Sequence, residues 1–135
     1  MSSTHGDYLF VYGTLRREAG HPMHGVLAAS ADFVDEAVFQ GKLYLVRHYP
    51  GVLPSDSPAD AVRGEVYALR DAGLLERLDA YEGIGPIAAP PHEYVRQRQH
   101  VRLARGETVE AWVYLYNWPV DKFERLESGD FLAGR

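Results

Sequence analysis

The 135-residue sequence contains no cysteine, which excludes disulfide bonds, thiolate metal sites and a cysteine nucleophile. It also lacks any apolar run approaching the ~20 residues that cross a bilayer as a helix. Residues 1–7 lack the basic and apolar regions of a secretory signal. We therefore expect a cytoplasmic protein that does not enter a membrane.

Basic residues are also in short supply, with 14 Lys and Arg against 19 Asp and Glu and a net charge of −5. Nucleic-acid binding needs clustered basic residues on one face, so we expect no nucleic-acid partner. One local exception is the alternation of Arg96, Arg98, His100 and Arg102. This spacing predicts a solvated sheet face with acidic partners on neighbouring strands. A surface for an anionic ligand or a protein contact is the alternative.

No repeat or long linker divides the chain, so we expect a single domain over residues 1–135 with a core from about 8 to 117. Nothing in the pattern predicts an oligomeric state. Helices are predicted at 23–31 and 72–82, with a turn of helix at 120–127. Short runs rich in branched and aromatic residues predict strands at 8–12, 36–39, 42–46, 61–69, 94–103 and 108–116.

Glycine and proline set the expected boundaries between these elements. Gly41 is predicted to separate two short strands, and the proline-flanked segment 49–54 to form a loop. Gly64 predicts a bulge or a close backbone approach inside its strand, and Arg105-Gly106 predicts a hairpin turn. The expected fold is therefore an α+β domain in which a mixed sheet curls into a small barrel with a few flanking helices.

The helix predicted at 72–82 breaks its own amphipathic pattern at its end. Leu74, Leu75, Leu78 and Tyr81 form an apolar stripe at helical spacing, and Glu82 falls inside that stripe. A carboxylate directed at an apolar face has a raised pKa and is suited to proton transfer near neutral pH. The alternative is a helix-end glutamate that points to water. Periodicity leaves both open.

A glycine-led turn follows the first strand, in the sequence Tyr12-Gly13-Thr14-Leu15-Arg16. Glycine allows a positive φ or a close approach to the backbone. Successive amide N–H groups in such a turn can bind a carboxylate or a developing oxyanion. An ordinary turn has the same composition, so both interpretations stay open here. Arg16 is a candidate partner for a substrate carboxylate, or a solvated side chain.

Five segments in order carry a resemblance to a known family: YLFVYGTLR at 8–16, HPMH at 21–24, YPG at 49–51, GEVY at 64–67 and LDAYEG at 78–83. Together they resemble the gamma-glutamylcyclotransferase-like family, nearest the branch of gamma-glutamylamine cyclotransferases and small bacterial homologues. The resemblance covers roughly residues 8 to 117. It implies a compact fold around a small β-barrel.

The same resemblance implies roles for particular residues. Glu82 matches the catalytic glutamate, Tyr12, Gly13, Thr14 and Leu15 match the substrate-binding loop, and Tyr94 matches a tyrosine of the substrate site. The implied reaction converts a γ-glutamyl amine or amide to 5-oxoproline and a free amine, with a small-molecule substrate and no cofactor. Tyr116 is a candidate to line the same cavity or to fill the barrel.

Two alternatives to this activity remain at this stage. One is a binding module that keeps the pocket for a small carboxylate-bearing ligand without turnover, and the other is an interaction domain that uses the arginine-rich strand face. A metal site is not expected, because His21 and His24 are separated by Pro22 and no third ligand is evident. Gly83-Ile84-Gly85 follows a helix and lacks the third glycine of a dinucleotide fingerprint.

Overall fold

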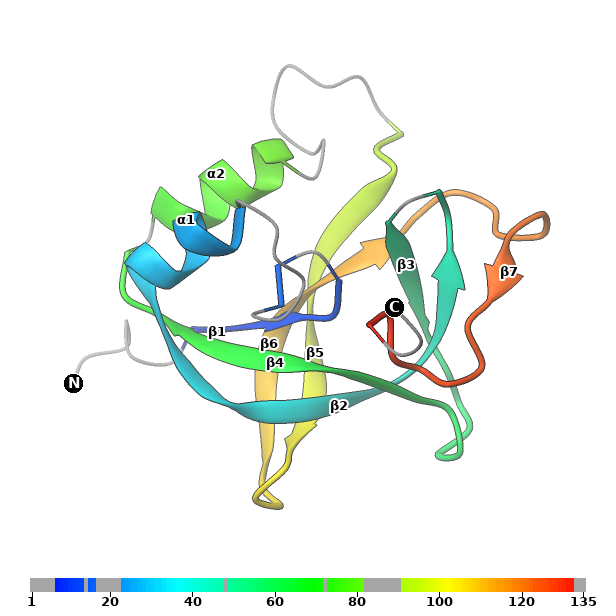
Figure 1. Cartoon of the computed structure of the whole chain (residues 1–135), viewed down its shortest axis with the longest axis horizontal. Helices are drawn as coiled ribbons and strands as arrows, with labels where there is room; N and C mark the ends of the chain where they lie inside the picture. Colours follow the sequence, from blue (N-terminus) through cyan, green and yellow to red (C-terminus); the bar gives the residue numbers. More distant parts are fainter. Residues whose placement is uncertain are drawn as a thin grey trace.

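The computed structural model describes residues 7–13, 15–16, 23–47, 49–71, 73–81 and 91–132 (Figure 1). In chain order, the elements are β1 (Tyr8–Val11), α1 (Met23–Ser30), β2 (Ala31–Leu45), β3 (Pro50–Pro54), β4 (Ala61–Leu69), α2 (Gly73–Tyr81), β5 (Tyr94–Leu103), β6 (Thr108–Tyr116) and β7 (Glu124–Arg125). No described helix has the length and apolar character needed to span a membrane.

Within the described residues, five strands close into a mixed barrel in the order β2-β4-β1-β6-β5, and β5 pairs again with β2. The β1–β6 pairing is parallel, through Leu9 and Trp112, and the other pairings of the ring are antiparallel. Figure 1 shows α1 and α2 together on one side of this barrel, with β3 and β7 on the opposite side. The predicted α+β fold with a small barrel is confirmed.

The long strand β2 corrects the prediction of two short strands broken at Gly41. The strand runs unbroken from Ala31 to Leu45, with a register shift between Phe33 and Asp35. Gly41 pairs with Pro54, and a Cβ at Gly41 would lie 2.6 Å from the Leu53 carbonyl oxygen. The glycine therefore lets two parts of the chain approach closely and does not end the strand.

The segment predicted as a loop is also a strand. β3 pairs with the second half of β2, and its two prolines stand at its ends, where Pro50 faces Leu45 and Pro54 faces Gly41. Proline is tolerated at the ends and edges of sheets because its missing N–H then breaks no ladder bond. The prediction of a turn of helix at 120–127 is also wrong. This stretch contains the short strand β7, which pairs with Tyr44 and Leu45 of β2.

Local signals predicted the remaining elements correctly. The β5–β6 hairpin turns at Gly106, whose φ is +112°. Asp71 caps α2, since its Oδ1 accepts the Gly73 N–H at 2.9 Å. Leu74 and Leu78 of the apolar stripe are fully buried. Gly64 marks a close approach, because a Cβ there would lie 2.3 Å from the Val11 carbonyl oxygen.

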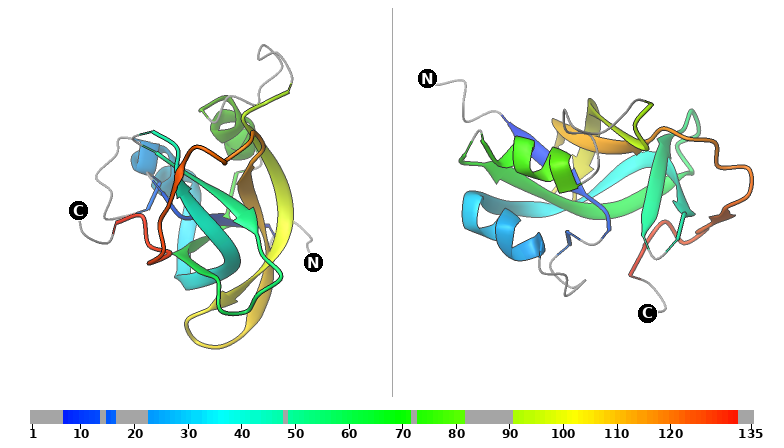
Figure 2. Two further views of the ribbon diagram at one scale, coloured as in Figure 1. Left: turned by 90° about the vertical axis from the view of Figure 1, so that its right-hand side faces the viewer. Right: turned by 90° about the horizontal axis from the view of Figure 1, so that it is seen from above.

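Two apolar cores lie on either side of the barrel wall, because successive residues of a strand face opposite sides. In β1, Phe10 belongs to the core inside the barrel, whereas Leu9 and Val11 belong to the core under α1 and α2. Figure 2 shows both helices covering the outer side of β1 and β4. The C-terminal segment packs Phe131 into the inner core, and Gly129 accepts the Arg63 N–H at 2.7 Å.

Candidate functional site

The loop after β1 is anchored by a buried side chain on each side of the barrel wall. Tyr12 lies in the inner core and donates its hydroxyl to the Tyr114 carbonyl oxygen at 2.5 Å. Leu15 is buried in the outer core under the helices. Between them the chain turns tightly, with the Arg16 N–H donating to the Gly13 carbonyl at 3.1 Å. Thr14, the remaining predicted loop residue, lies outside the described residues.

Gly13 packs directly against Pro50, the first residue of β3. A Cβ at Gly13 would lie 2.7 Å from Pro50 Cγ and 3.0 Å from Cδ, closer than an ordinary contact. Among the described glycines, only Gly106 and Gly129 have a positive φ. Glycine is therefore required at position 13 for close approach and not for a left-handed backbone. The loop can lie against β3 because residue 13 has no side chain that would collide with the Pro50 ring.

Tyr94, predicted from the resemblance, contacts the carbonyl group of the same proline. The Tyr94 side chain is buried, and its hydroxyl donates to the Pro50 carbonyl oxygen at 2.5 Å. Pro50 thus lies between Gly13 and Tyr94 and brings these two predicted site residues together. The sequence pattern placed Pro50 in a loop, and the Tyr-Pro-Gly motif at 49–51 carried part of the family resemblance.

A carboxylate that the sequence analysis did not single out lies next to this contact. Glu93 precedes Tyr94, and its Oε2 accepts the Tyr49 hydroxyl at 2.9 Å. Burial, together with a hydrogen bond to Glu93, raises the pKa of the Tyr116 hydroxyl to about 12. The Tyr116 ring packs on Gly51, where an added Cβ would meet it at 2.7 Å, and on Tyr94 at 5.3 Å between ring centroids. The Glu93 carboxylate therefore accepts the Tyr49 hydroxyl and interacts with the Tyr116 hydroxyl.

The last turn of α2 is fixed onto β5 and β6 by Asp79. Its two carboxylate oxygens accept bonds from Arg96 Nε at 2.7 Å and Nη2 at 2.9 Å, and Oδ1 also accepts the Tyr114 hydroxyl at 2.7 Å. Hydrogen bonding to Asp79 is the main reason that the pKa of Arg96 is raised. Asp79 therefore has a structural role, because it joins the helix to both strands. Glu82, the predicted catalytic residue, follows directly after this helix and lies outside the described residues.

Arg16 is not a solvated side chain, because carboxylates of the chain itself lie against it. Its Nη1 donates to Asp130 Oδ1 at 2.7 Å, and its Nε lies 3.8 Å from Oε2 of Glu65, which is only 2% exposed. Burial raises the pKa of Asp130, but hydrogen bonds from Arg16 and the Leu132 amide outweigh it and leave the pKa lowered. Arg16 therefore ties the loop after β1 to the C-terminal segment.

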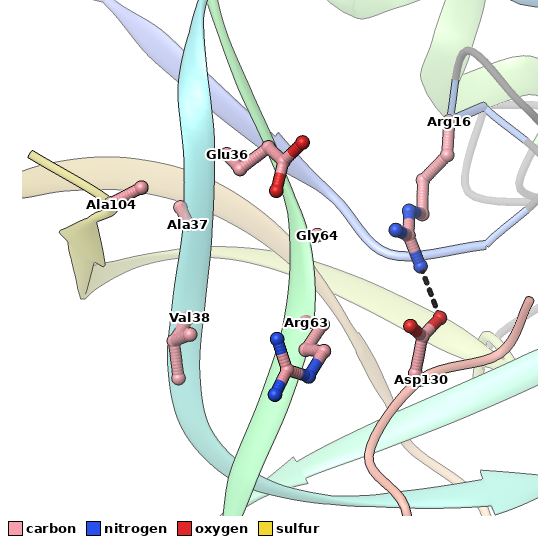
Figure 3. A pocket seen from close by; sticks show the side chains of 8 residues that line it. All are labelled: Arg16, Glu36, Ala37, Val38, Arg63, Gly64, Ala104 and Asp130. Carbon is pink, nitrogen blue, oxygen red and sulfur yellow. Dashed lines mark hydrogen bonds and ion pairs between the residues drawn. The ribbon is translucent and has the colours of Figure 1, made fainter. Parts of the chain in front are cut away.

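A cavity of about 150 Å³ opens beside this ion pair on the outer face of β2 and β4 (Figure 3). Its charged lining residues balance, with two arginines and two carboxylates: Arg16, Arg63, Glu36 and Asp130. The cavity therefore has no net charge that would select an anion or a cation, and we assign it no ligand.

The arginine-rich face of β5 is partnered by acids and by one tryptophan. Arg96 and Arg98 lie over the Trp112 ring, with Cζ at 4.5 and 4.6 Å from its centroid. Arg98 also pairs with Asp7 and with Glu110 of β6 at 3.3 and 3.4 Å. The prediction of a sheet face with acidic partners on neighbouring strands is confirmed at Arg98. Arg102 is exposed at the other end of the same strand.

A metal site has no support among the residues that the structure describes, since no group of three potential ligands comes together there. His24 has Nδ1 2.9 Å from the Leu15 carbonyl oxygen and so contacts the loop after β1. His21, its predicted neighbour, lies outside the described residues.

Comparison with known proteins gives consistent matches along nearly the whole chain. The model of the family "Gamma-glutamyl cyclotransferase, AIG2-like" matches residues 9–133. The gamma-glutamylcyclotransferase family protein YtfP of Escherichia coli K12 is 37% identical over 124 residues, which is 92% of this chain and 95% of that protein. A putative gamma-glutamylcyclotransferase of Methanocaldococcus jannaschii is 32% identical over 126 residues, covering 93% and 95%.

Solved structures agree with the sequence matches. The solution structure of E. coli ytfP superimposes with a TM-score of 0.65 at 33% identity and covers 93% of this chain and 96% of that one. The crystal structure of an AIG2-like protein from Mus musculus gives a TM-score of 0.64 at 29% identity, with coverage of 82% and 77%.

Proposed function

Because the chain belongs to the gamma-glutamyl cyclotransferase, AIG2-like family, we propose that it converts an L-γ-glutamyl amine or amide into 5-oxoproline and a free amine. The observation that carries this proposal is the family match over residues 9–133, which includes the loop after β1, β3 and the start of β5. The contacts of Pro50 with Gly13 and Tyr94, which join these segments, support it.

The proposed reaction needs positioning more than it needs a strong nucleophile. In a γ-glutamyl amide, the α-amine can reach the γ-carbonyl carbon and close a five-membered lactam. Holding the bent conformer supplies rate by proximity. The new bond joins the α-nitrogen to the carbonyl carbon, and the bond from that carbon to the amine nitrogen breaks.

Glu82 is the proposed general base and then general acid. As a carboxylate it takes a proton from the α-ammonium group, which frees the amine to attack, and it then gives this proton to the leaving nitrogen. The ring nitrogen still carries a second proton after the attack, and the same carboxylate passes it to the departing amine, so that a neutral lactam and an ammonium ion are formed. Its place directly after α2 supports this role, because Asp79 in the last turn of that helix is fixed to Arg96 and Tyr114. A rigid helix end positions a catalytic group more precisely than an unsupported loop does.

The loop of Tyr12, Gly13, Thr14 and Leu15 is the proposed binding element for the developing oxyanion, through its amide N–H groups. The burial of Tyr12 and Leu15 supports this role, because a preorganised loop loses little entropy when the charge develops. Tyr94 holds the carbonyl of Pro50, so we assign it the positioning of β3 behind Gly13. Direct contact of Tyr94 with substrate stays a prediction.

The test is release of 5-oxoproline by the purified protein from γ-glutamyl amines, γ-glutamyl dipeptides and glutathione. The Glu82→Gln variant is expected to keep its fold and to lose about 10²–10⁴-fold in kcat, the usual contribution of a positioned acid/base group. Glu76→Gln, at an exposed position of the same helix, is the matched control and is expected to keep full activity. Unchanged turnover in Glu82→Gln would contradict the assignment. Ligand binding without any 5-oxoproline release would favour the binding-module alternative.

A further inference from the structure

Glu93 differs from most of the partly or fully buried carboxylates of the described chain in having no ion pair. Asp35 shares this property, but its oxygens accept the backbone N–H groups of Glu36 and Arg105. Asp60, Asp79 and Asp130 each form an ion pair with an arginine at 2.6 to 2.7 Å. Glu65 lies 3.8 Å from Arg16. In the described part of the chain, Glu93 forms no ion pair. Its Oε2 accepts the neutral hydroxyl of Tyr49 at 2.9 Å, and the neutral hydroxyl of Tyr116 interacts with it.

These neutral partners leave the negative charge of Glu93 uncompensated. A carboxylate has about four lone-pair positions, and two hydroxyl donors leave room for another donor. Withdrawing a carboxylate from water without a cationic partner costs free energy. Arg47 lowers the pKa of Tyr116, but it is exposed, and the described residues show no ion pair between it and Glu93. The site therefore suits a cation that comes from outside the chain.

Aromatic side chains cluster around Tyr116, which interacts with the same carboxylate. The ring of Tyr116 contacts those of Tyr94, Trp118 and Phe123, with centroids 5.3 to 6.5 Å apart. Trp118 is 41% exposed, and its indole N–H is used on the Pro91 carbonyl oxygen at 3.1 Å. Aromatic faces attract ammonium groups and also pack against alkyl chains. A carboxylate beside such rings fits a group with a short alkyl chain and a terminal ammonium.

Glu93 is also next to the loop that the proposed function uses. Tyr49, which bonds Glu93, precedes Pro50, and Pro50 packs on Gly13. Tyr94, which follows Glu93, donates to the carbonyl of Pro50. The carboxylate and the loop after β1 therefore lie on two sides of one proline.

We propose that Glu93, oriented by Tyr49 and Tyr116, is the subsite for the amine portion of the substrate and selects amines that carry a second, positively charged nitrogen on an alkyl chain. This inference rests on the proposed function and adds to it the class of amine released. The glutamyl portion is held at the loop after β1, and the cationic end of the leaving amine reaches Glu93.

The test compares two γ-glutamyl amides of equal length. One is the monoamide of a diaminoalkane, with a terminal ammonium, and the other carries a methyl group in its place. Glu93→Gln keeps the size of the side chain and a hydrogen-bond acceptor for the tyrosines but removes the charge. It is expected to lose about 10- to 100-fold in kcat/KM on the ammonium substrate, the usual value of a charge-assisted hydrogen bond. On the methyl substrate it should stay within a factor of about three.

Two further variants sharpen the comparison. Glu110→Gln makes the same change at an exposed position of the β5–β6 hairpin and is expected to leave both substrates unaffected. Tyr49→Phe keeps the ring but removes one hydroxyl from Glu93, and it should cost about three- to tenfold on the ammonium substrate alone. An equal loss on both substrates, or no loss on either, in Glu93→Gln would overturn the subsite.

Calorimetric binding of the free diaminoalkane and of the matching monoamine separates this inference from the proposed reaction. If the wild-type protein releases no 5-oxoproline but binds the diaminoalkane more tightly than Glu93→Gln does, the subsite stands and the proposed reaction fails. If the wild-type protein turns over both amides and shows no dependence on the second charge, the reaction stands and the subsite fails.

Discussion

Replacement of Gly13 by alanine tests whether the contact between the loop after β1 and β3 is as tight as the structure indicates. The added Cβ would lie 2.7 Å from Pro50 Cγ, whereas ordinary van der Waals contact begins at 3.4 Å. The loop and the proline ring must therefore move apart by roughly 0.7 Å. The proline ring is closed onto its own backbone, so it cannot rotate away as a flexible side chain would. The movement has to be taken up by the backbone of the loop or of β3.

The expected cost has a structural and a functional part. Overpacking of this kind costs about 1–3 kcal/mol of unfolding free energy. A displacement approaching 1 Å in a positioning element can cost about 10²-fold in rate. For Gly13→Ala we therefore expect kcat/KM for 5-oxoproline release to fall by about 10- to 100-fold. Because Gly13 has no positive φ, backbone strain adds nothing to this cost.

The measurements are urea unfolding and 5-oxoproline release for Gly13→Ala and for a control, Gly25→Ala. Gly25 lies in α1, and apart from the backbone of its own helix no described atom lies within 4 Å of its Cβ position. Alanine is the better helix former there, by up to about 1 kcal/mol, so the control should be slightly more stable and fully active.

A double variant shows whether Pro50 is the origin of the effect. Pro50→Ala removes Cγ and Cδ, the two atoms that an alanine at position 13 would meet. In the Pro50→Ala background, Gly13→Ala should therefore cost less than in the wild-type protein, with a coupling energy of about 0.5–3 kcal/mol. Equal stability and activity of Gly13→Ala and Gly25→Ala would refute the tight contact. A coupling energy near zero would refute its assignment to Pro50.

Two further predictions concern the residues around the site. Asp79→Asn removes the charge that holds Arg96 and should cost about 1.5–3 kcal/mol in urea unfolding, whereas Arg98→Gln on the exposed part of the same strand should cost less than about 0.5 kcal/mol. The Tyr116 hydroxyl has its pKa raised from 10.0 to about 12, so its contribution to stability is complete below pH 10 and is lost as the pH rises to about 12. The unfolding free energy should therefore fall less between pH 9.5 and 11.5 in Tyr116→Phe than in the wild-type protein, and an identical fall in both would contradict the assigned shift.

Elements with a local cause could be predicted from the sequence. The β5–β6 hairpin follows from period-two alternation around a glycine that adopts a positive φ. The helix α2 follows from the Asp71 cap and the leucine stripe. By contrast, β3 exists because its backbone pairs with a distant part of β2, and nothing within the five residues of β3 encodes that pairing. Proline in this segment predicts a loop unless the partner strand is known.

In the candidate site, too, some residues have a local signal in the sequence and others depend on contacts between distant segments. The glycine-led turn at Gly13 is a local signal, and the family resemblance selected Tyr94. The contact that joins them depends on Pro50, which a reading of local pattern assigns to a loop. Glu93 was not singled out as an individual residue, because a carboxylate just before a strand is ordinary in sequence. It becomes unusual only when its partners are seen to be two tyrosines.

Asp79 is paired with a cation of the chain, whereas Glu93 is not. The unfolding free energy of variants at these two positions can therefore show which carboxylate belongs to the scaffold. Asp79 neutralises Arg96, so its replacement by asparagine leaves a partly buried cation without its partner and destabilises the fold. Glu93 neutralises no described cation, so Glu93→Gln removes a charge whose burial the fold does not compensate. In one urea series, Asp79→Asn should therefore be clearly less stable than the wild-type protein, whereas Glu93→Gln should be equally stable or more stable. A large loss of stability in Glu93→Gln would mean that the charge of Glu93 stabilises the fold. No ligand would then be needed to explain why a charged residue stands at this position.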